Sequence, residues 1–120
     1  MNYNRPSYRE LDKKIKAAKD ALIERNGIFA NVNKVVGELN ELEMESSDLI
    51  WNLILELLDE IAPEKYAGKR PPDKSYEKKI EKSELYAFCW NSKKLGKKMY
   101  IKFALKENTY YYVSLHKSKV

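Results

Sequence analysis

Three side chains that can act together on a phosphate lie near the C-terminal end of the sequence: Tyr100, Lys102 and His116. An imidazole can accept or donate a proton near neutral pH, and a lysine or tyrosine can hold phosphate oxygens. Cys89, the single cysteine, is better explained as a core residue than as a nucleophile, because the single histidine is far from it in sequence. With so few His and Cys ligands, a metal site is not expected.

Each of these residues also has a purely structural interpretation. A lone histidine is usually an ordinary surface or structural residue. Tyr100 and Tyr112 are good strand formers, and Lys102 could protect an exposed strand from edge pairing. The functional interpretation therefore depends on whether the fold brings these side chains to one surface.

The last third of the sequence alternates with a period of two, which predicts strands over 85–90, around 98–106 and around 110–116. If the apolar residues of the last two strands face one core, the numbers of two directly opposed residues sum to 216. The loop that joins the two strands then consists of residues 107–109. Sums of 214 or 218 would leave the same residues on each face of the sheet and would shift the opposed partners by two residues. The register places Tyr100 opposite His116 and Lys102 opposite Ser114, with Tyr112 on the same outward face.

The first half of the sequence has helical periodicity, with apolar residues recurring every three or four positions. We expect helices over 8–22, 30–39 and 48–61. Their start and stop signals are Pro6-Ser7, Asn26-Gly27, Ser46 or Ser47, and Pro63.

Residues 63–84 are rich in lysine and contain Gly68 and Pro71-Pro72, which is typical of a loop; a helical turn is expected near 76–82. The chain is therefore predicted to be one α+β domain over 1–120, made of a helical half (1–62), a basic loop segment (63–84) and antiparallel strands (85–120). Two or three N-terminal helices should pack on one face of a small antiparallel sheet.

Charge is distributed unevenly along the 120 residues, whose formal net charge is +5. Residues 1–62 hold 8 basic and 12 acidic side chains, whereas residues 63–120 hold 15 basic and 6 acidic ones. A basic half favours a polyanionic partner such as RNA. No apolar run is long enough to cross a bilayer and the N-terminus lacks an apolar signal segment, so we expect a soluble protein of a reducing compartment, the cytoplasm.

Three segments in order resemble the MqsR-type toxins of bacterial toxin–antitoxin systems, within the RelE-like ribonuclease superfamily. They are Leu85-Tyr-Ala-Phe88, Lys97-Lys-Met-Tyr100-Ile-Lys102-Phe-Ala-Leu105 and Tyr112-Val-Ser-Leu-His116. Leu39-Asn-Glu-Leu42 and Lys65-Tyr-Ala-Gly-Lys69 agree with the same layout. The sequence departs from the family at Leu115, where Phe is usual, and at Cys89-Trp90, where a Gly-Lys pair is frequent.

The resemblance implies a translation-inhibiting endoribonuclease that works without metal or other cofactor, cleaves mRNA by attack of a ribose 2′-OH, and is neutralised by a cognate antitoxin protein. It assigns catalytic roles to Tyr100 and His116, and to Lys69 with Arg70 as the neighbouring alternative. Lys102 is added to these catalytic residues because the predicted register places it next to them on the sheet. RNA-binding positions are expected at Arg70, Tyr86, Lys97, Lys98 and Tyr112.

Two other functions are compatible with the sequence. A non-catalytic RNA-binding or protein-interaction module would use the same basic sheet face. An antitoxin or DNA-binding repressor is less compatible, because the basic residues lie on expected strands and loops rather than on a recognition helix.

Overall fold

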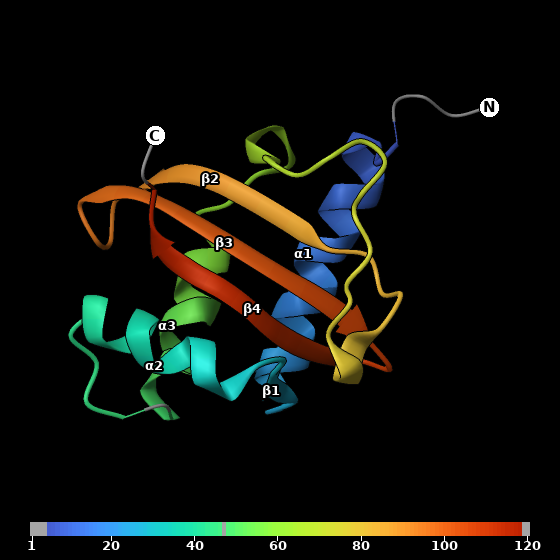
Figure 1. Ribbon diagram of the computed structural model, residues 1–120. Coiled ribbons are helices and arrows are strands. Elements are labelled where there is room, and N and C mark those ends of the chain that lie inside the picture. The colour runs from blue at the N-terminus through green and yellow to red at the C-terminus, as the bar shows by residue number, and fades with distance from the viewer. Residues whose placement is uncertain (1–4, 47, 119–120) are drawn as a thin grey trace.

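The computed structural model describes residues 5–46 and 48–118. It is an α+β fold with a four-stranded sheet in the order β1-β4-β3-β2 (Figure 1). The elements are α1 (Tyr8–Ile23), β1 (Gly27–Phe29), α2 (Val32–Glu41), α3 (Asp48–Leu58), the 3-10 turns η1 (Pro63–Lys65) and η2 (Lys78–Ile80), β2 (Tyr86–Ser92), β3 (Lys97–Lys106) and β4 (Thr109–Lys117).

The sheet is mixed rather than antiparallel, because β1 pairs in parallel with β4. This strand was not expected, and it lies between α1 and α2, so the helices are not all N-terminal to the strands. Gly27 allows the close packing there: a Cβ at this position would lie 2.8 Å from Cε3 of Trp51. Short strands of this kind carry too little periodicity to be recognised from sequence.

The three helices begin close to the expected positions. Ser7 caps α1 by accepting a hydrogen bond from the Glu10 amide at 3.1 Å. The left-handed residue after α1 is Arg25, with φ of 62°, rather than Asn26 or Gly27. Asn31 caps α2, which spans 32–41 rather than 30–39.

The third helix is shorter than expected, because it ends at Leu58 and not at Pro63. Ser46 Oγ accepts a hydrogen bond from the Asp48 amide at 3.2 Å, as expected of a helix start. The alternative cap, Ser47, lies outside the described residues. Pro63 instead begins η1.

The main core lies between one face of the sheet and the helices α1 and α3. Its fully buried members include Leu11, Ile50, Ile54, Phe88 and Ile101. The helices α1 and α3 cover this face, whereas α2 lies beside β4 (Figure 1). The expectation of helices on one face therefore holds for α1 and α3.

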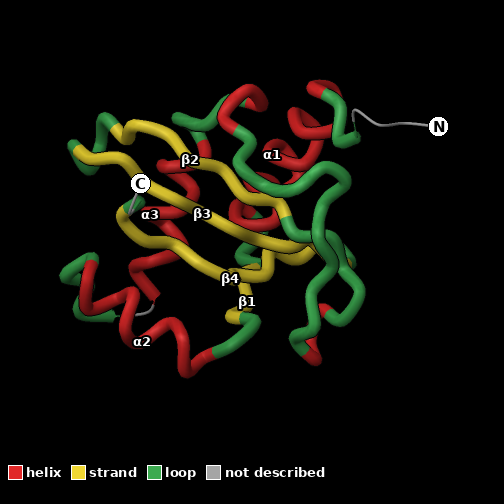
Figure 2. Tube along the Cα trace, turned by 45° about the horizontal axis from the view of Figure 1, so that its top comes forward, coloured by secondary structure: helices red, strands yellow, loops and turns green. Residues whose placement is uncertain are grey.

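The loop segment 63–84 first runs along the β2 border of the sheet, where Tyr66 bridges to Phe88, and its later part lies over the other face (Figure 2). Ile80, in η2, is fully buried in a second small cluster with Ala30 and Ala104, against which Val113 packs. The expected helical turn near 76–82 is present as η2. The loop is thus anchored to the sheet, and it leaves the surface around Tyr100 and His116 uncovered by helices.

No helix in the described part of the chain combines the length and the apolar character that crossing a bilayer requires.

Candidate active site

The pairing of β3 with β4 brings together the two residues that the register argument placed opposite each other. Tyr100 pairs with His116, and Lys102 pairs with Ser114. The Tyr100 and His116 rings stack, with centroids 5.1 Å apart and planes inclined by 20°. The Lys102 Nζ lies 5.8 Å from the centre of the Tyr100 ring. A phenol, an ammonium and an imidazole therefore share the helix-free face, as predicted.

Lys69 joins this group from the loop segment, although it is distant in sequence. A cavity of about 200 Å³ is lined by Lys69, Tyr100 and Lys102, with Asp73 beside them and Ala87 from β2. Lys69 Nζ lies 3.8 Å from the nearer carboxylate oxygen of Asp73, which holds the lysine at the rim. Three of the four predicted catalytic residues thus line one cavity, and the fourth, His116, stacks on the ring of Tyr100.

Within residues 5–46 and 48–118, one ring nitrogen of His116 has a hydrogen-bond partner. Its Nδ1 lies 2.9 Å from the carbonyl oxygen of Lys117. Because a carbonyl oxygen can only accept, this hydrogen bond needs the hydrogen on Nδ1. The neutral imidazole then carries its lone pair on Nε2, which is the atom able to accept a proton from a substrate.

The hairpin that carries these residues differs from the expected one in its loop. The loop has two residues, Glu107 and Asn108, both with positive φ (51° and 60°), rather than three. The register changes between Lys102 and Phe103, so the sum of 216 holds only at the end that carries Tyr100. A β-bulge on β4 absorbs the difference of one residue.

This bulge overturns the expectation for Tyr112. Tyr112 pairs with Phe103 and is 1% exposed, so it lies in the core and not on the outward face. Its hydroxyl donates to Glu38 Oε1 at 2.5 Å. Burial, together with that carboxylate, raises its pKa far above the ordinary value. Tyr112 is therefore not available as a surface contact for RNA.

Glu38 is the buried acceptor that holds the bulged strand in place. Besides Tyr112, it accepts hydrogen bonds from Ser114 Oγ at 3.2 Å and from the Leu115 amide at 3.0 Å. The carboxylate thus satisfies three buried donors next to His116. No sequence pattern predicts this role, because Glu38 occupies a position in α2 where an ordinary polar residue would fit the helical pattern equally well.

Tyr86 is also buried, being 2% exposed on the helix-covered side of β2. Its hydroxyl donates to Glu84 at 3.1 Å, and burial raises its pKa well above the ordinary value. The expectation that Tyr86 contacts RNA, which came from the resemblance, does not fit this burial. Strand parity accounts for the difference, because Tyr86 pairs with the core residue Phe103.

Arg70 has a structural position beside the site. Its guanidinium donates to the carbonyl oxygen of Pro6 at 2.8 Å and lies 5.0 Å from the centre of the Tyr66 ring. It does not line the cavity that contains Lys69. Of the two neighbouring cations considered for catalysis, Lys69 is the one beside Tyr100.

Lys97 and Lys98 are exposed at the start of β3. Lys98 shares strand parity with Tyr100 and Lys102, so it extends the cationic row along the outward face. Lys97 has the opposite parity and lines a separate cavity with Lys117. Both remain predicted RNA contacts.

No family model, curated protein or solved structure matches this chain. The assignment of function therefore rests on the residues and their geometry.

Two neighbours of the site were not anticipated. Asp73 lies on the loop and Cys89 pairs with Tyr100 across β2 and β3. Asp73 has no sequence signal, since loop contacts follow no period. Cys89 was expected in the core, but it is only partly buried, because its partner across the strands is Tyr100 of the outward face. Within 5–46 and 48–118, no cluster of three or more His, Cys, Asp or Glu side chains is arranged to hold a metal ion.

Proposed function

We propose that this protein is a metal-independent endoribonuclease of the mRNA-interferase type, the toxin of a type II toxin–antitoxin pair. The observation that supports this most is the joint placement of Tyr100, Lys102, His116 and Lys69 on one helix-free surface. These groups supply what cleavage by a neighbouring hydroxyl requires: a base, cations and a phosphate-orienting donor. The resemblance to MqsR-type toxins supplies the cellular role.

The proposed reaction forms a bond between the ribose 2′-oxygen and phosphorus and breaks the bond from phosphorus to the 5′-oxygen. Nε2 of His116 takes the 2′-hydroxyl proton. Lys69 and Lys102 offset the extra negative charge on the phosphate, and the Tyr100 hydroxyl orients it. A proton reaches the leaving 5′-oxygen from an acid, a role that the Lys102 ammonium can fill. The products are a 2′,3′-cyclic phosphate and a free 5′-hydroxyl.

The test is cleavage of an end-labelled single-stranded RNA by the purified protein in EDTA. We expect the parent to cleave and His116→Ala to be slower by about 10²–10⁴-fold. Lys102→Ala should also be impaired, whereas Lys13→Ala, which removes an exposed lysine from α1, should match the parent. Replacing the 2′-hydroxyl by hydrogen at the cleaved nucleotide should stop the reaction.

Two results would contradict the proposal. Cleavage by His116→Ala at the parent rate would remove the imidazole from the mechanism. Binding of RNA by the parent without any cleavage would favour the alternative of a non-catalytic RNA-binding module on the same basic face.

The cellular part of the proposal has its own test. In the cytoplasm of a bacterial host, expression should arrest growth, and His116→Ala should relieve the arrest. A small antitoxin encoded beside the gene should protect the host when co-expressed. Arrest that persists with His116→Ala would show that toxicity has another cause.

A further inference from the structure

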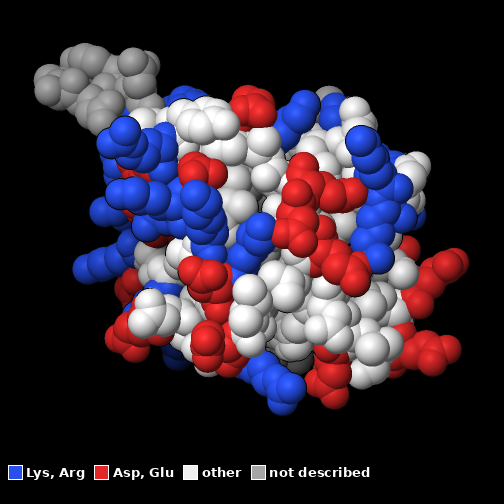
Figure 3. All heavy atoms as spheres, turned by 180° about the vertical axis from the view of Figure 1, so that it is seen from behind, with Lys and Arg blue, Asp and Glu red and all other residues white. Residues whose placement is uncertain are grey.

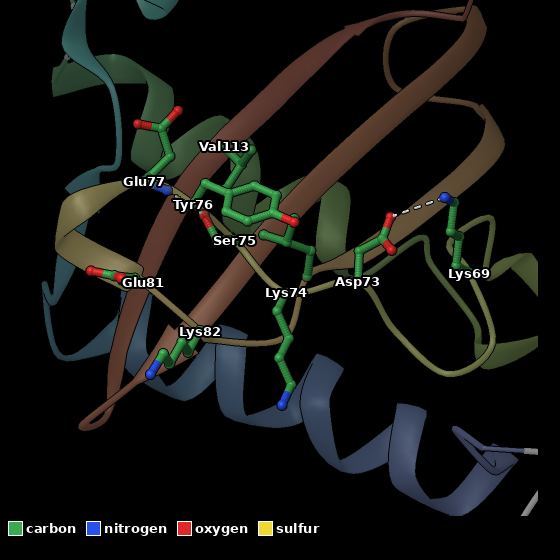
Figure 4. A pocket seen from close by; sticks show the side chains of 10 residues that line it. Lys69, Asp73, Lys74, Ser75, Tyr76, Glu77, Glu81, Lys82 and Val113 are labelled. Atoms are coloured by element: carbon green, nitrogen blue, oxygen red, sulfur yellow. Dashed lines mark hydrogen bonds and ion pairs between the residues drawn. The ribbon is translucent and has the colours of Figure 1, made fainter.

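A second and larger cavity continues from the candidate active site along the loop segment. Its volume is about 700 Å³, and it shares Lys69, Asp73 and Leu85 with the smaller cavity that contains Tyr100. Val113 of β4 also lines it. In Figure 4, Lys69 and Asp73 lie at one end of this cavity and Glu77 and Glu81 at the other, with Tyr76 between them. A polymer held at Tyr100 would therefore pass directly into it.

The wall of this cavity is fixed in place before any ligand arrives. The segment 73–85 folds back on itself: the Ser75 amide donates to the Ser83 carbonyl at 2.9 Å and the Leu85 amide to the Asp73 carbonyl at 2.7 Å. Fully buried Ile80 anchors the segment to the sheet. Binding therefore does not require this loop to become ordered first.

Tyr76 presents an aromatic surface in this cavity. Its side chain is 98% exposed, unlike the buried tyrosines of the core. An open aromatic face among lysine side chains, here Lys69, Lys74 and Lys82, is a usual platform on which single-stranded nucleic acids stack their bases. The position also fits the geometry, because a base next to the phosphate at Tyr100 would enter at the Lys69 end.

The charged side chains of the cavity select among the bases. Three carboxylates and three ammonium groups line it, namely Asp73, Glu77, Glu81, Lys69, Lys74 and Lys82. The lysines can neutralise the phosphates, and the carboxylates can only accept hydrogen bonds. Adenine, cytosine and guanine offer an exocyclic amino group to such an acceptor. Uracil offers only one ring N–H between two carbonyl oxygens, which repel a carboxylate.

We propose that this cavity binds the nucleobase next to the scissile phosphate, stacked on Tyr76, with its exocyclic amino group on Glu77 or Glu81. The inference rests on the proposed function for the location of that phosphate. It adds a preference for amino-bearing bases over uracil.

The test uses fluorescein-labelled 2′-O-methyl oligonucleotides of A, C and U, whose binding is measured by fluorescence anisotropy. These probes cannot be cleaved, so the readout does not depend on His116. We expect the parent to bind the A and C probes more tightly than the U probe. Tyr76→Ala should weaken binding of the A and C probes by about fivefold or more. Tyr8→Ala, which removes another exposed tyrosine from α1, should have no effect.

A double variant, Glu77→Gln with Glu81→Gln, tests the base selection. Loss of two negative charges should tighten binding of every probe. The informative quantity is therefore the ratio of the dissociation constants of the different probes. The advantage of A and C over U should shrink or vanish. The unfolding midpoints of all variants should match the parent, since the replaced side chains lie outside the two buried clusters.

The outcomes separate this inference from the proposed function. Equal binding of the U probe by the parent, or unchanged binding by Tyr76→Ala, would overturn the base site even if unmodified RNA is cleaved. The expected binding pattern together with intact unmodified RNA would uphold the base site and overturn the nuclease.

Discussion

The carboxylate of Glu38 shows how much of the candidate site depends on one residue that takes no part in the chemistry. It ties α2 to β4 through Tyr112, Ser114 and the Leu115 amide, directly before His116. The three residues that donate these hydrogen bonds are buried, so losing this acceptor would leave their donors unsatisfied. The position of His116 on β4 therefore depends on α2, the helix that carries Glu38.

Replacing Glu38 tests this dependence. Glu38→Ala should destabilise the protein by about 1–3 kcal/mol, because buried donors lose their acceptor. Glu38→Gln should cost less, since its amide oxygen can still accept from Tyr112 and Leu115 while its NH₂ donates to Ser114. Urea unfolding followed by tryptophan fluorescence measures both. Equal losses for the two variants would show that packing, and not hydrogen bonding, is the contribution of Glu38.

At this scale the sequence predicts some residues and not others. Alternation placed Tyr100 opposite His116 because strand parity follows from the apolar pattern alone. It misplaced Tyr112, because a bulge changes parity without changing composition. The family resemblance predicted Lys69 as a site residue, but no periodic pattern did. The neighbours of a loop residue are set by tertiary contacts, which leave no period in the sequence.

Among the elements, the loop segment 63–84 differs most from what its composition suggests. A lysine-rich stretch with Gly and two adjacent prolines is typical of a solvated loop, yet η2 inserts Ile80 into a cluster on the sheet. The short strand β1 was likewise missed, because three residues cannot display a period. The long helices and strands were predictable, since each shows several repeats of its own period.

Ile80→Ala should detach this segment from the sheet. We expect a loss of about 2–5 kcal/mol in unfolding free energy, the range for removing a fully buried aliphatic side chain. Hydrogen exchange should become faster for the amides of 75–85. Lys78→Ala, an exposed neighbour in the same turn, should leave both unchanged. Unaltered exchange in Ile80→Ala would mean that the loop is held by its backbone hydrogen bonds alone.

The N-terminal segment is joined to the start of β2 by an ion pair that should respond to pH. Arg5 makes two hydrogen bonds of 2.6 Å to the Glu84 carboxylate, and these lower the pKa of Glu84. A carboxylate whose pKa is lowered by folding stabilises the folded state above its unfolded pKa of about 4.3. That contribution is lost as the pH falls through the lower folded value.

The matching measurement compares the parent with Arg5→Ala in urea at several pH values. The parent should be the more stable at pH 6–7, and the difference should shrink as the solution is acidified below about pH 4. The exposed pair Lys16–Asp12 provides a control, because Lys16→Ala should change stability little at any pH. A difference for Arg5→Ala that is constant with pH would exclude the ion pair as its source.

For the whole molecule, the division of charge in the sequence is only partly kept in space. Acidic and basic side chains both lie on the face that α1 and α3 cover (Figure 3). Ion pairs join the two halves, as between Lys94 and Glu56, and between Arg5 and Glu84. The cationic character is therefore local, in the lysines of β3 and the loop segment.

Salt dependence can test that local character. Each phosphate contact to a single strand contributes about 0.7 to the slope of log affinity against log salt. Lys102→Ala should lower the magnitude of the slope by about this amount, whereas Lys13→Ala should not change it. Binding of an uncleavable RNA at several KCl concentrations supplies the measurement. Equal slopes for the two variants would place Lys102 away from the bound phosphates.

The two borders of the sheet have a consequence for how copies of the chain behave together. At one border β1 offers only Gly27–Phe29, and at the other the Ala67 amide donates to the Ala87 carbonyl at 2.8 Å and so occupies the start of β2. A second copy thus meets only short rows of free backbone groups on which to add a strand. Addition of a strand along the start of β2 would first have to strip the chain around residue 67 from this border, so we expect that local opening to promote aggregation on heating.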